Sequence, residues 1–298
     1  MTVKSTLLLF LTCSLLYGSE TDSLTTRIIY YIHGDASYLF HNREGAQINA
    51  DTRILKQALC VAQSSFNSEV FILHHKPARK FLFFFRLENL DFYYFRNGEL
   101  KEKSSYGVND IPAVQLQFDL IKKYGNRNTS DLRNFYLFYG HQIPEGDGYG
   151  YNSSQPDLPL NIILLKEALK SYIADKQFEM ILLSTCKNGT RYSVGELAEL
   201  SKYIIASPED LSLYHISSIP FKIFSKYPHI TTNDFTRILS RYAFKKLKSQ
   251  ALTVTAISLY DTASLQEKGG VSVLFNPPHF GKNKNDKQHS GWSKEEKE

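Results

Sequence analysis

Short apolar runs alternate along this chain with segments whose apolar residues recur at helical spacing, and this alternation constrains the fold more than any other feature. The apolar runs predict strands at 27–35, 69–75, 134–141, 178–186 and 204–207. The amphipathic segments predict helices at 51–63, 114–125, 159–175, 194–203 and 232–249. Such an alternation is typical of a mostly parallel sheet covered by helices on both faces. We therefore expect an α/β sandwich.

One region departs from the alternation. The aromatic-rich runs FLFFFRL and DFYYFRNGEL, within residues 81–100, resemble the two arms of a hairpin, and Asn97-Gly98 is a turn signal. We therefore expect an antiparallel hairpin beside the parallel strands.

The size and charge of the chain limit its class. A chain of 298 residues with 42% hydrophobic residues is long enough for one large domain or two small ones with a substantial core. The net charge of +5 is mild for this length, so we expect no nucleic-acid partner. Residues 281–298 are charged and nearly free of aliphatic side chains, which predicts a disordered tail.

The N-terminal segment indicates export. Lys4 precedes an apolar run from Leu7 to Tyr17, and small and polar residues follow. This pattern is typical of a secretory signal peptide over residues 1–19, which places the protein outside the cell, in the periplasm or at the cell surface. A lipoprotein acylated at Cys13 is the alternative. No other run is long and apolar enough to predict a membrane span, so the expected folded domain is 20–280.

A possible active site lies where the predicted strands end. His141 follows the strand NFYLFYG, and Cys186 follows FEMILLST 45 residues later. Because ligands bind beyond the carboxyl ends of parallel strands, an imidazole and a thiol would meet at one edge of the sheet. A cysteine nucleophile needs such a base to form its thiolate. Purely structural roles for both residues are the alternative at this point.

The blocks NFYLFYGHQ and FEMILLSTC resemble the histidine and cysteine blocks of the clostripain family of cysteine peptidases. The similarity extends in the same order over about residues 27–277, through IIYYIHGDASYL with its Asp-containing turn, VGELAELSKYIIASPED, AISLYD and GVSVLF. The resemblance implies a caspase-like three-layer α/β sandwich. It also implies hydrolysis of protein or peptide substrates through a thioacyl intermediate, without a cofactor.

The resemblance assigns roles to individual residues. His141 would be the general base and Cys186 the nucleophile. The backbone N–H groups of Gln142 and Cys186 would form the oxyanion hole, and Gln142 stands where the family has glycine. A backbone donor tolerates this change of side chain.

The chain departs from the family at the expected substrate pocket. Ser184 and Tyr214 stand where the family commonly has acidic residues that are associated with a pocket for Arg or Lys. Only Glu209 and Asp210 lie nearby as substitutes, and a buried cation needs a paired carboxylate. We therefore expect weak selectivity for basic residues.

Two other classes of function remain open. A metallohydrolase could gather metal ligands at the sheet edge from His33, His74, His75, His141 and Asp35. Their spacing matches no compact ligand motif, and we expect no metal. A secreted binding module could keep the fold without catalysis. Asn128, Asn152 and Asn188 also begin Asn-x-Ser/Thr triplets, which are glycan acceptors only in a eukaryotic secretory pathway.

Overall fold

The computed structural model describes residues 24–34, 39–41, 45–77, 79–81, 85–87, 89–107, 113–125, 132–146, 160–173, 176–211, 217–227, 229–250 and 256–266. The expected signal peptide, the expected tail, the GVSVLF run, Asp35 and Tyr214 lie outside these ranges.

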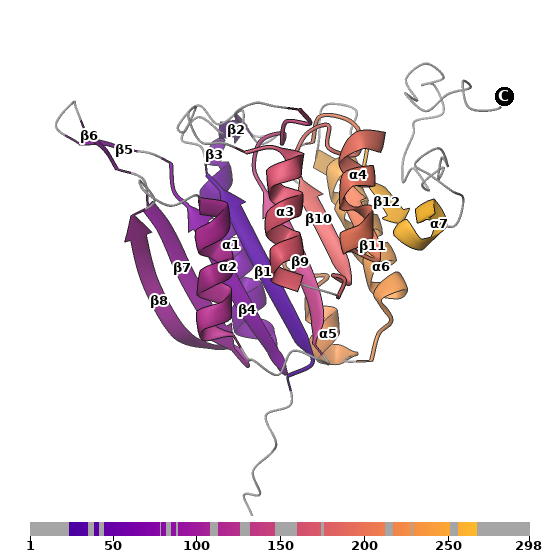
Figure 1. Ribbon diagram of the computed structural model, residues 1–298, viewed down its shortest axis with the longest axis horizontal. Helices are drawn as coiled ribbons and strands as arrows, with labels where there is room; N and C mark the ends of the chain where they lie inside the picture. Colours follow the sequence, from indigo (N-terminus) through magenta and orange to yellow (C-terminus); the bar gives the residue numbers. More distant parts are fainter. Residues whose placement is uncertain are drawn as a thin grey trace, which may run out of the picture.

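An eight-stranded sheet forms the centre of the structure, in the order β12-β11-β10-β9-β1-β4-β7-β8 (Figure 1). Its strands are β1 (Thr26–His33), β4 (Ser68–His75), β7 (Asn89–Arg96), β8 (Glu99–Gly107), β9 (Arg133–Tyr139), β10 (Met180–Ser184), β11 (Tyr203–Ala206) and β12 (Ser258–Asp261). Strands β4, β1, β9, β10 and β11 pair in parallel, and β12, β7 and β8 join antiparallel at the two edges. The expected mostly parallel sheet is therefore confirmed.

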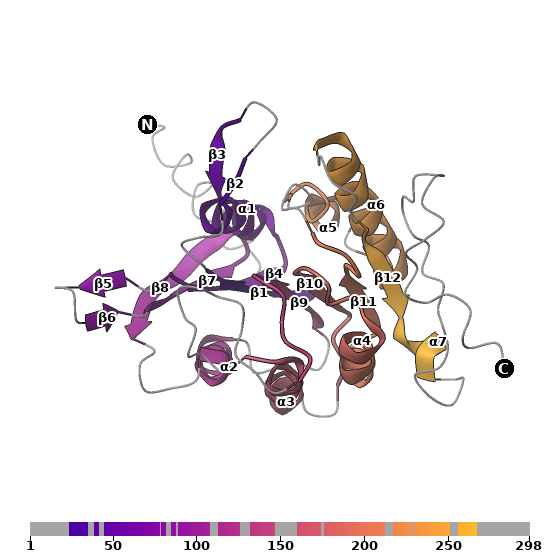
Figure 2. The same cartoon turned by 90° about the horizontal axis from the view of Figure 1, so that it is seen from above.

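Helices cover both faces of this sheet, so that the molecule has three layers (Figure 2). One face carries α1 (Ala50–Ser64), α5 (Lys222–Lys226) and α6 (Thr232–Gln250). The other carries α2 (Ala113–Tyr124), α3 (Ile162–Ile173), α4 (Arg191–Leu197) and the 3-10 turn η2 (Ala198–Leu200). The short helix α7 (Thr262–Gln266) follows β12. None of the helices in the described part of the chain combines the length and apolar composition needed to cross a membrane.

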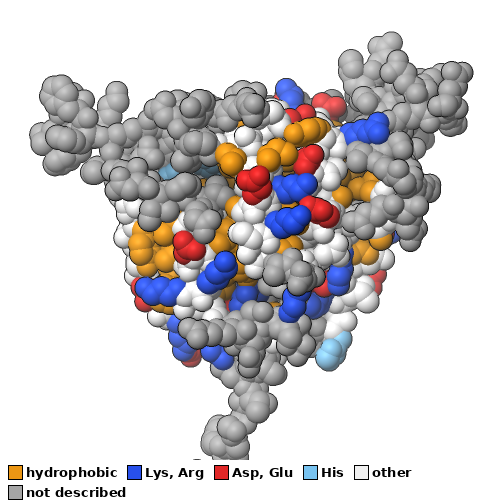
Figure 3. All heavy atoms as spheres, viewed as in Figure 1, with side chains coloured by type: hydrophobic (Ala, Val, Ile, Leu, Met, Phe, Trp, Pro, Cys, Tyr) orange, Lys and Arg blue, Asp and Glu red, His pale blue; other side chains and the backbone are white. Residues whose placement is uncertain are grey.

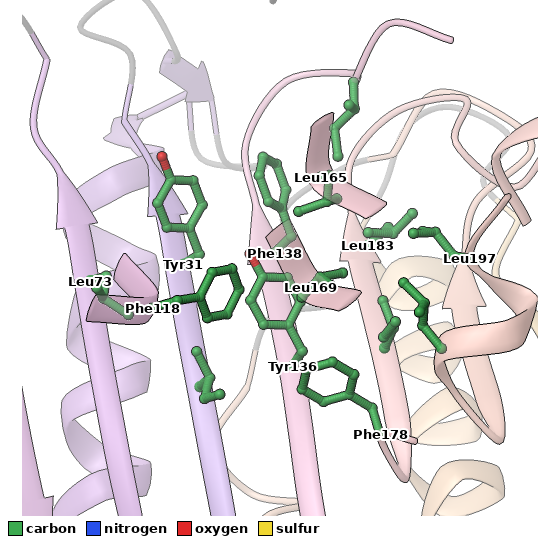
Figure 4. Packing of buried hydrophobic residues seen from close by; sticks show 14 of the residues in the cluster. Tyr31, Leu73, Phe118, Tyr136, Phe138, Leu165, Leu169, Phe178, Leu183 and Leu197 are labelled. Carbon is green, nitrogen blue, oxygen red and sulfur yellow. The ribbon is translucent and has the colours of Figure 1, made fainter. Parts of the chain in front are cut away.

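Two hydrophobic cores lie between the layers, and the central strands contribute to both. Alternate residues of β1 point to opposite faces, so that Tyr30 packs in the core under α1 and Tyr31 in the core under α2 and α3. Figure 4 shows the second core, in which Phe118 of α2 and Tyr136 of β9 lie near Tyr31. Burial on both faces explains why these strands are continuous apolar runs.

The outer surface over α3 and α4 is charged (Figure 3). Lys166 of α3 binds Glu196 of α4 at 2.9 Å, and Lys170 binds Glu199 at 3.4 Å. Exposed pairs of this kind contribute about 0–1 kcal/mol each, so the apolar cores account for most of the stability of this layer.

The predicted hairpin is correct in its turn and wrong in its arms. Residues 89–96 pair with β8 through Asn97-Gly98, whose φ angles of 53° and 83° suit a two-residue hairpin turn. The described residues of the run FLFFFRL instead belong to a separate small hairpin, in which β5 (Arg79–Phe81) pairs with β6 (Phe85–Leu87). Another small hairpin pairs β2 (Leu39–His41) with β3 (Gln47–Asn49).

The helix predicted at 194–203 begins and ends earlier than expected. The hydroxyl oxygen of Thr190 accepts a hydrogen bond from the Ser193 backbone N–H at 3.1 Å, and α4 therefore starts at Arg191. The helix passes into η2, and Tyr203 already belongs to β11. This early start brings the beginning of α4 close to Cys186 in sequence.

Candidate active site

Strands β9 and β10 end side by side at the carboxyl edge of the sheet. They pair in parallel up to Tyr139 and Ser184, and the Gly140 N–H continues the pairing by donating to the Ser184 carbonyl at 3.4 Å. His141 and Cys186 each lie two residues beyond this last pair, and both are half-buried. The expected position of an imidazole and a thiol beyond neighbouring strand ends is therefore present.

The sulfur of Cys186 lies against the turn that follows β11. Its Sγ accepts a hydrogen bond from the Leu211 backbone N–H at 3.3 Å. The Lys187 N–H donates to the Glu209 carbonyl at 3.1 Å, and the Gly189 N–H donates to the Ser207 carbonyl at 2.7 Å. These backbone bonds hold the segment after Cys186 beside the turn 207–211.

Close packing in this region requires a glycine at position 189. A Cβ atom on Gly189 would lie 2.6 Å from the backbone nitrogen of Pro208 and 2.7 Å from the carbonyl carbon of Ser207. Neither backbone atom can move without displacing the turn. Lys187 meanwhile has a φ of 52°, a left-handed conformation that is uncommon for a residue with a side chain. The chain therefore reverses sharply just after Cys186.

Burial raises the pKa of the Cys186 thiol above its ordinary value, because desolvation disfavours the thiolate. The Leu211 N–H acts in the opposite direction by stabilising the thiolate. Among the nearby charges, Asp210 raises the pKa of Cys186 and Lys187 lowers it. The raised pKa favours the thiol over the thiolate, so use of Cys186 as a nucleophile would require a proton acceptor.

The pocket residues expected from the sequence gather around Cys186 to different degrees. Glu209 and Asp210 lie on the turn that contacts Cys186, and the Asp210 carboxylate pairs with Lys187 Nζ at 3.3 Å. Ser184 ends β10, is only 1% exposed, and lines a small cavity between β10, β11 and α6. Gln142 is half-buried directly after His141. Tyr214 lies outside the described residues.

The other histidines at this edge lie on opposite faces of the sheet. His33 and His75 stack with ring centroids 5.6 Å apart in line with the α2–α3 face. His74 points to the α1 face, where its Nε2 is 3.8 Å from the Asp51 carboxylate. Within the described ranges, no group of three or more His, Cys, Asp or Glu side chains is placed to hold a metal ion.

Asn188 has a structural role that was not expected from the sequence, where it stands out only as the start of a glycan triplet. Its side chain is 0% exposed, and its Nδ2 and Oδ1 bind both backbone polar groups of Ile143. A buried and hydrogen-bonded carboxamide is not accessible to a glycosyl donor in the folded chain. An asparagine two residues after a candidate nucleophile, before a helix start, was the available signal.

Comparisons with known proteins connect this geometry to a family of proteases. No family model and no curated protein matches the sequence. The structure is similar to a secreted C11 cysteine protease from Bacteroides thetaiotaomicron in complex with an irreversible peptide inhibitor, with a TM-score of 0.55 and 15% identity over 82% of this chain and 67% of that one. A second structure of a secreted C11 cysteine protease from the same organism matches with a TM-score of 0.55 and 11% identity, over 82% of this chain and 68% of that one.

An inactive zymogen of a C11 protease from Parabacteroides distasonis is similar with a TM-score of 0.50 and 15% identity, over 82% of this chain and 64% of that one. This chain therefore spans about two thirds of the length of these proteases. At such low identity the likeness shows the fold, which is the one that the sequence resemblance implied. The chain has the caspase-like α/β sandwich fold of the C11, or clostripain-family, cysteine proteases.

Proposed function

We propose that this protein is an exported cysteine endopeptidase in which His141 and Cys186 form the catalytic dyad. The observation that carries this proposal is the parallel register of β9 and β10, whose last pair, Tyr139 and Ser184, lies two residues before His141 and Cys186. The likeness of the fold to cysteine proteases supports the same reaction class. Fold alone does not determine function, and the proposal therefore rests on the site.

In the proposed reaction, the Cys186 thiol transfers its proton to the His141 imidazole as Sγ attacks the carbonyl carbon of the scissile peptide bond. The tetrahedral oxyanion accepts hydrogen bonds from the backbone N–H groups of Gln142 and Cys186. Collapse of this intermediate breaks the C–N bond, and the imidazolium gives its proton to the leaving amine. Water then attacks the thioester with His141 as base, releasing the acid and restoring the thiol.

The raised pKa of Cys186 makes the proposed base, His141, necessary for forming the nucleophile. A thiol with an ordinary or raised pKa is mostly protonated at neutral pH. In the proposed dyad, the His141 imidazole removes this proton during attack, so the reaction does not depend on a preformed thiolate. The Leu211 N–H, 3.3 Å from Sγ, stabilises negative charge that develops on the sulfur.

We further propose that selectivity for Arg or Lys before the scissile bond is weak. Ser184 provides no charge, and the Asp210 carboxylate beside Cys186 is partnered by Lys187. A substrate guanidinium would have to displace this lysine before it could use Asp210. Any remaining preference for a cation would come from Glu209 or Asp210.

The extent and location of the domain belong to the same proposal. Residues 20–280 would be the peptidase domain after removal of a signal peptide at 1–19, with a charged tail at 281–298. One structural neighbour is itself described as secreted. N-terminal sequencing of exported material should give a start near residue 19 or 20, whereas a start at an acylated Cys13 would show the lipoprotein alternative to be correct.

A binding module without catalysis is the second candidate, because burial makes Cys186 harder to ionise. The deciding experiment is a peptide-library cleavage assay on the exported chain, with Cys186→Ala and His141→Ala as matched variants. We expect cleavage by the wild-type chain and none by either variant. Cleavage that persists in Cys186→Ala would refute the proposed mechanism, and slow alkylation of Cys186 without cleavage in the wild type would favour the binding module.

A further inference from the structure

The side chain of Asn188 joins the two segments that carry the proposed catalytic residues. Asn188 lies two residues after Cys186, and Ile143 lies two residues after His141. The Ile143 N–H donates to Asn188 Oδ1 at 2.8 Å, and Asn188 Nδ2 donates to the Ile143 carbonyl at 2.8 Å. The carboxamide therefore binds Ile143 as a neighbouring strand would, through one donor and one acceptor.

Two further hydrogen bonds fix the orientation of this carboxamide. The hydroxyl of Thr185, the residue before Cys186, donates to Asn188 Oδ1 at 2.7 Å. Asn188 Nδ2 also approaches the Ser193 hydroxyl oxygen at 3.4 Å. Both hydrogens and both lone pairs of the amide are thus occupied. A flipped amide would place its NH₂ group against the Ile143 N–H, so only one orientation fits.

The contact preserves the register of the sheet beyond the end of the strands. Paired residues of β9 and β10 are 45 positions apart in sequence, and so are Ile143 and Asn188. His141 and Cys186 have this same separation and lie between the last strand pair and the Asn188 contact. The segments on which they sit are consequently held together at both ends.

Glu145 makes a second contact of the same kind. Its carboxylate accepts hydrogen bonds from the Thr190 hydroxyl and, at 3.0 Å, from the Ser193 hydroxyl at the start of α4. Glu145 and Thr190 are again 45 positions apart. Hydrogen bonds from the side chains of Asn188 and Glu145 thus continue to link the two segments beyond the end of the backbone ladder.

We propose that Asn188 is a positioning residue, whose carboxamide sets the placement of the His141 segment relative to Cys186. This inference rests on the proposed dyad, and Asn188 acts through the Ile143 backbone. The neutral amide of Asn188 has both the acceptor for the Ile143 N–H and the donor for the Ile143 carbonyl. An apolar side chain would leave both buried groups unpaired, and a carboxylate would face the carbonyl oxygen without a proton to donate.

The test compares Asn188→Ala with Asn134→Ala in the mature chain carrying Cys60→Ala, so that Cys186 is the only thiol. Asn134 is also buried, at 6% exposure, and its Nδ2 donates to the Leu132 carbonyl at 3.1 Å near the opposite end of β9. Two quantities are measured for the folded fraction of each variant: the pH profile of Cys186 alkylation by iodoacetamide, and the turnover of fluorescently labelled casein. His141→Ala provides the profile of an unassisted thiol.

We expect Asn188→Ala to shift the alkylation profile toward that of His141→Ala and to lower casein turnover about a hundredfold, since an ångström-scale misplacement has effects of this size. Asn134→Ala should keep the alkylation profile and the casein turnover of the parent chain that carries only Cys60→Ala. If Asn188→Ala does not fold, Thr185→Val removes one bond to the carboxamide and should shift the profile less, in the same direction.

The outcomes separate the two proposals. The positioning role is overturned if Asn188→Ala keeps the alkylation profile and casein turnover of the Cys60→Ala parent while His141→Ala changes both. Where Asn188→Ala does not fold, the same outcome for Thr185→Val overturns it. An equal loss in Asn134→Ala also overturns it, because the effect would then be general destabilisation. Parental behaviour of His141→Ala overturns the dyad itself, and the positioning role with it.

Discussion

The two ends of the central sheet use polar residues in opposite ways. At the amino end, Arg27 and Glu69 face each other as register partners on β1 and β4, and both are buried. Arg27 also donates to the Tyr172 hydroxyl at 2.5 Å, and the Tyr94 hydroxyl donates to Glu69 at 3.4 Å. At the carboxyl end, the charged pair of Lys187 and Asp210 is largely exposed.

Because of this difference, substitutions at the amino end should mainly affect stability, and substitutions at the carboxyl end should mainly affect reactivity. Removing one partner of a buried ion pair leaves an uncompensated charge, so the amino end should be intolerant of single changes. At the carboxyl end, a contact close to the proposed dyad is made by the buried and neutral carboxamide of Asn188, and the thiol of Cys186 is half-buried. Changes there should affect reactivity far more than folding.

The largest expected effect is at the carboxyl end. Cys186→Ala and His141→Ala should each lower casein hydrolysis by about a thousandfold or more, and the double variant should lose no more than either single one, because the two groups of the proposed dyad would act as a unit. Urea unfolding should show changes in stability of about 1 kcal/mol or less. A double variant much less active than both single variants would indicate that the residues act separately.

At the amino end, Glu69→Ala should lower the free energy of unfolding by about 3–5 kcal/mol, because it leaves Arg27 buried without its carboxylate. Casein turnover per folded molecule should stay near that of the wild type. Urea denaturation measures the first quantity. The double variant Arg27→Met with Glu69→Leu is the control and should recover much of the loss, and failure to recover would mean that packing around Tyr172 matters more than charge.

Selectivity for the residue before the scissile bond should be weak, and smaller than the changes in activity and stability predicted above. We expect less than about a tenfold preference in kcat/KM among matched peptides carrying Arg, Lys, Gln or Leu there, because an unpaired buried guanidinium costs more than its contacts return. A hundredfold preference for Arg that disappears in Asp210→Asn would contradict this expectation and assign the pocket carboxylate to Asp210.

The smallest effect concerns the thiol itself. In a His141→Ala background, Asp210→Asn should lower the pKa of Cys186 and speed its alkylation severalfold at neutral pH, while Lys187→Ala should slow it. Both shifts should shrink in high salt, since these side chains are exposed. Iodoacetamide labelling that becomes slower in Asp210→Asn and faster in Lys187→Ala would show that these charges act on the thiol indirectly.

The buried centre of the sheet was easier to predict from the sequence than its exposed edge. The central residues of strands such as β1 and β4 are buried on both faces and are apolar, so that these runs were visible in the sequence. The edge strand β8, ELKEKSSYG, is exposed at alternate positions and carries charges, and it was missed. The start of α4 depended on the Thr190 cap, which its apolar pattern does not reveal.

At the site, strand ends alone placed His141 and Cys186 beyond the ends of what are neighbouring strands, and their pairing as a dyad stays a prediction. The contact of Asn188 with Ile143 could not be predicted in this way, because it depends on the register between two strands joined by a long connection. The position of Asp210 beside Cys186 likewise depends on the path of the turn after β11. Residues on strand ends were predictable from local patterns, whereas those on turns required the tertiary structure.

The neighbour of Asn188 in sequence gives this region a consequence for chemical ageing. In an Asn-Gly pair the following backbone nitrogen readily attacks the carbonyl carbon of the side-chain amide, which expels ammonia and forms a succinimide. Water then opens this ring to aspartate or isoaspartate. In the folded chain the Gly189 N–H is held by the Ser207 carbonyl at 2.7 Å and the Asn188 amide is fully engaged, so this reaction is suppressed. Unfolded molecules lack that protection. Each unfolding episode at elevated temperature should therefore leave a fraction of chains permanently deamidated at residue 188. This fraction should grow with the time that the chains spend unfolded.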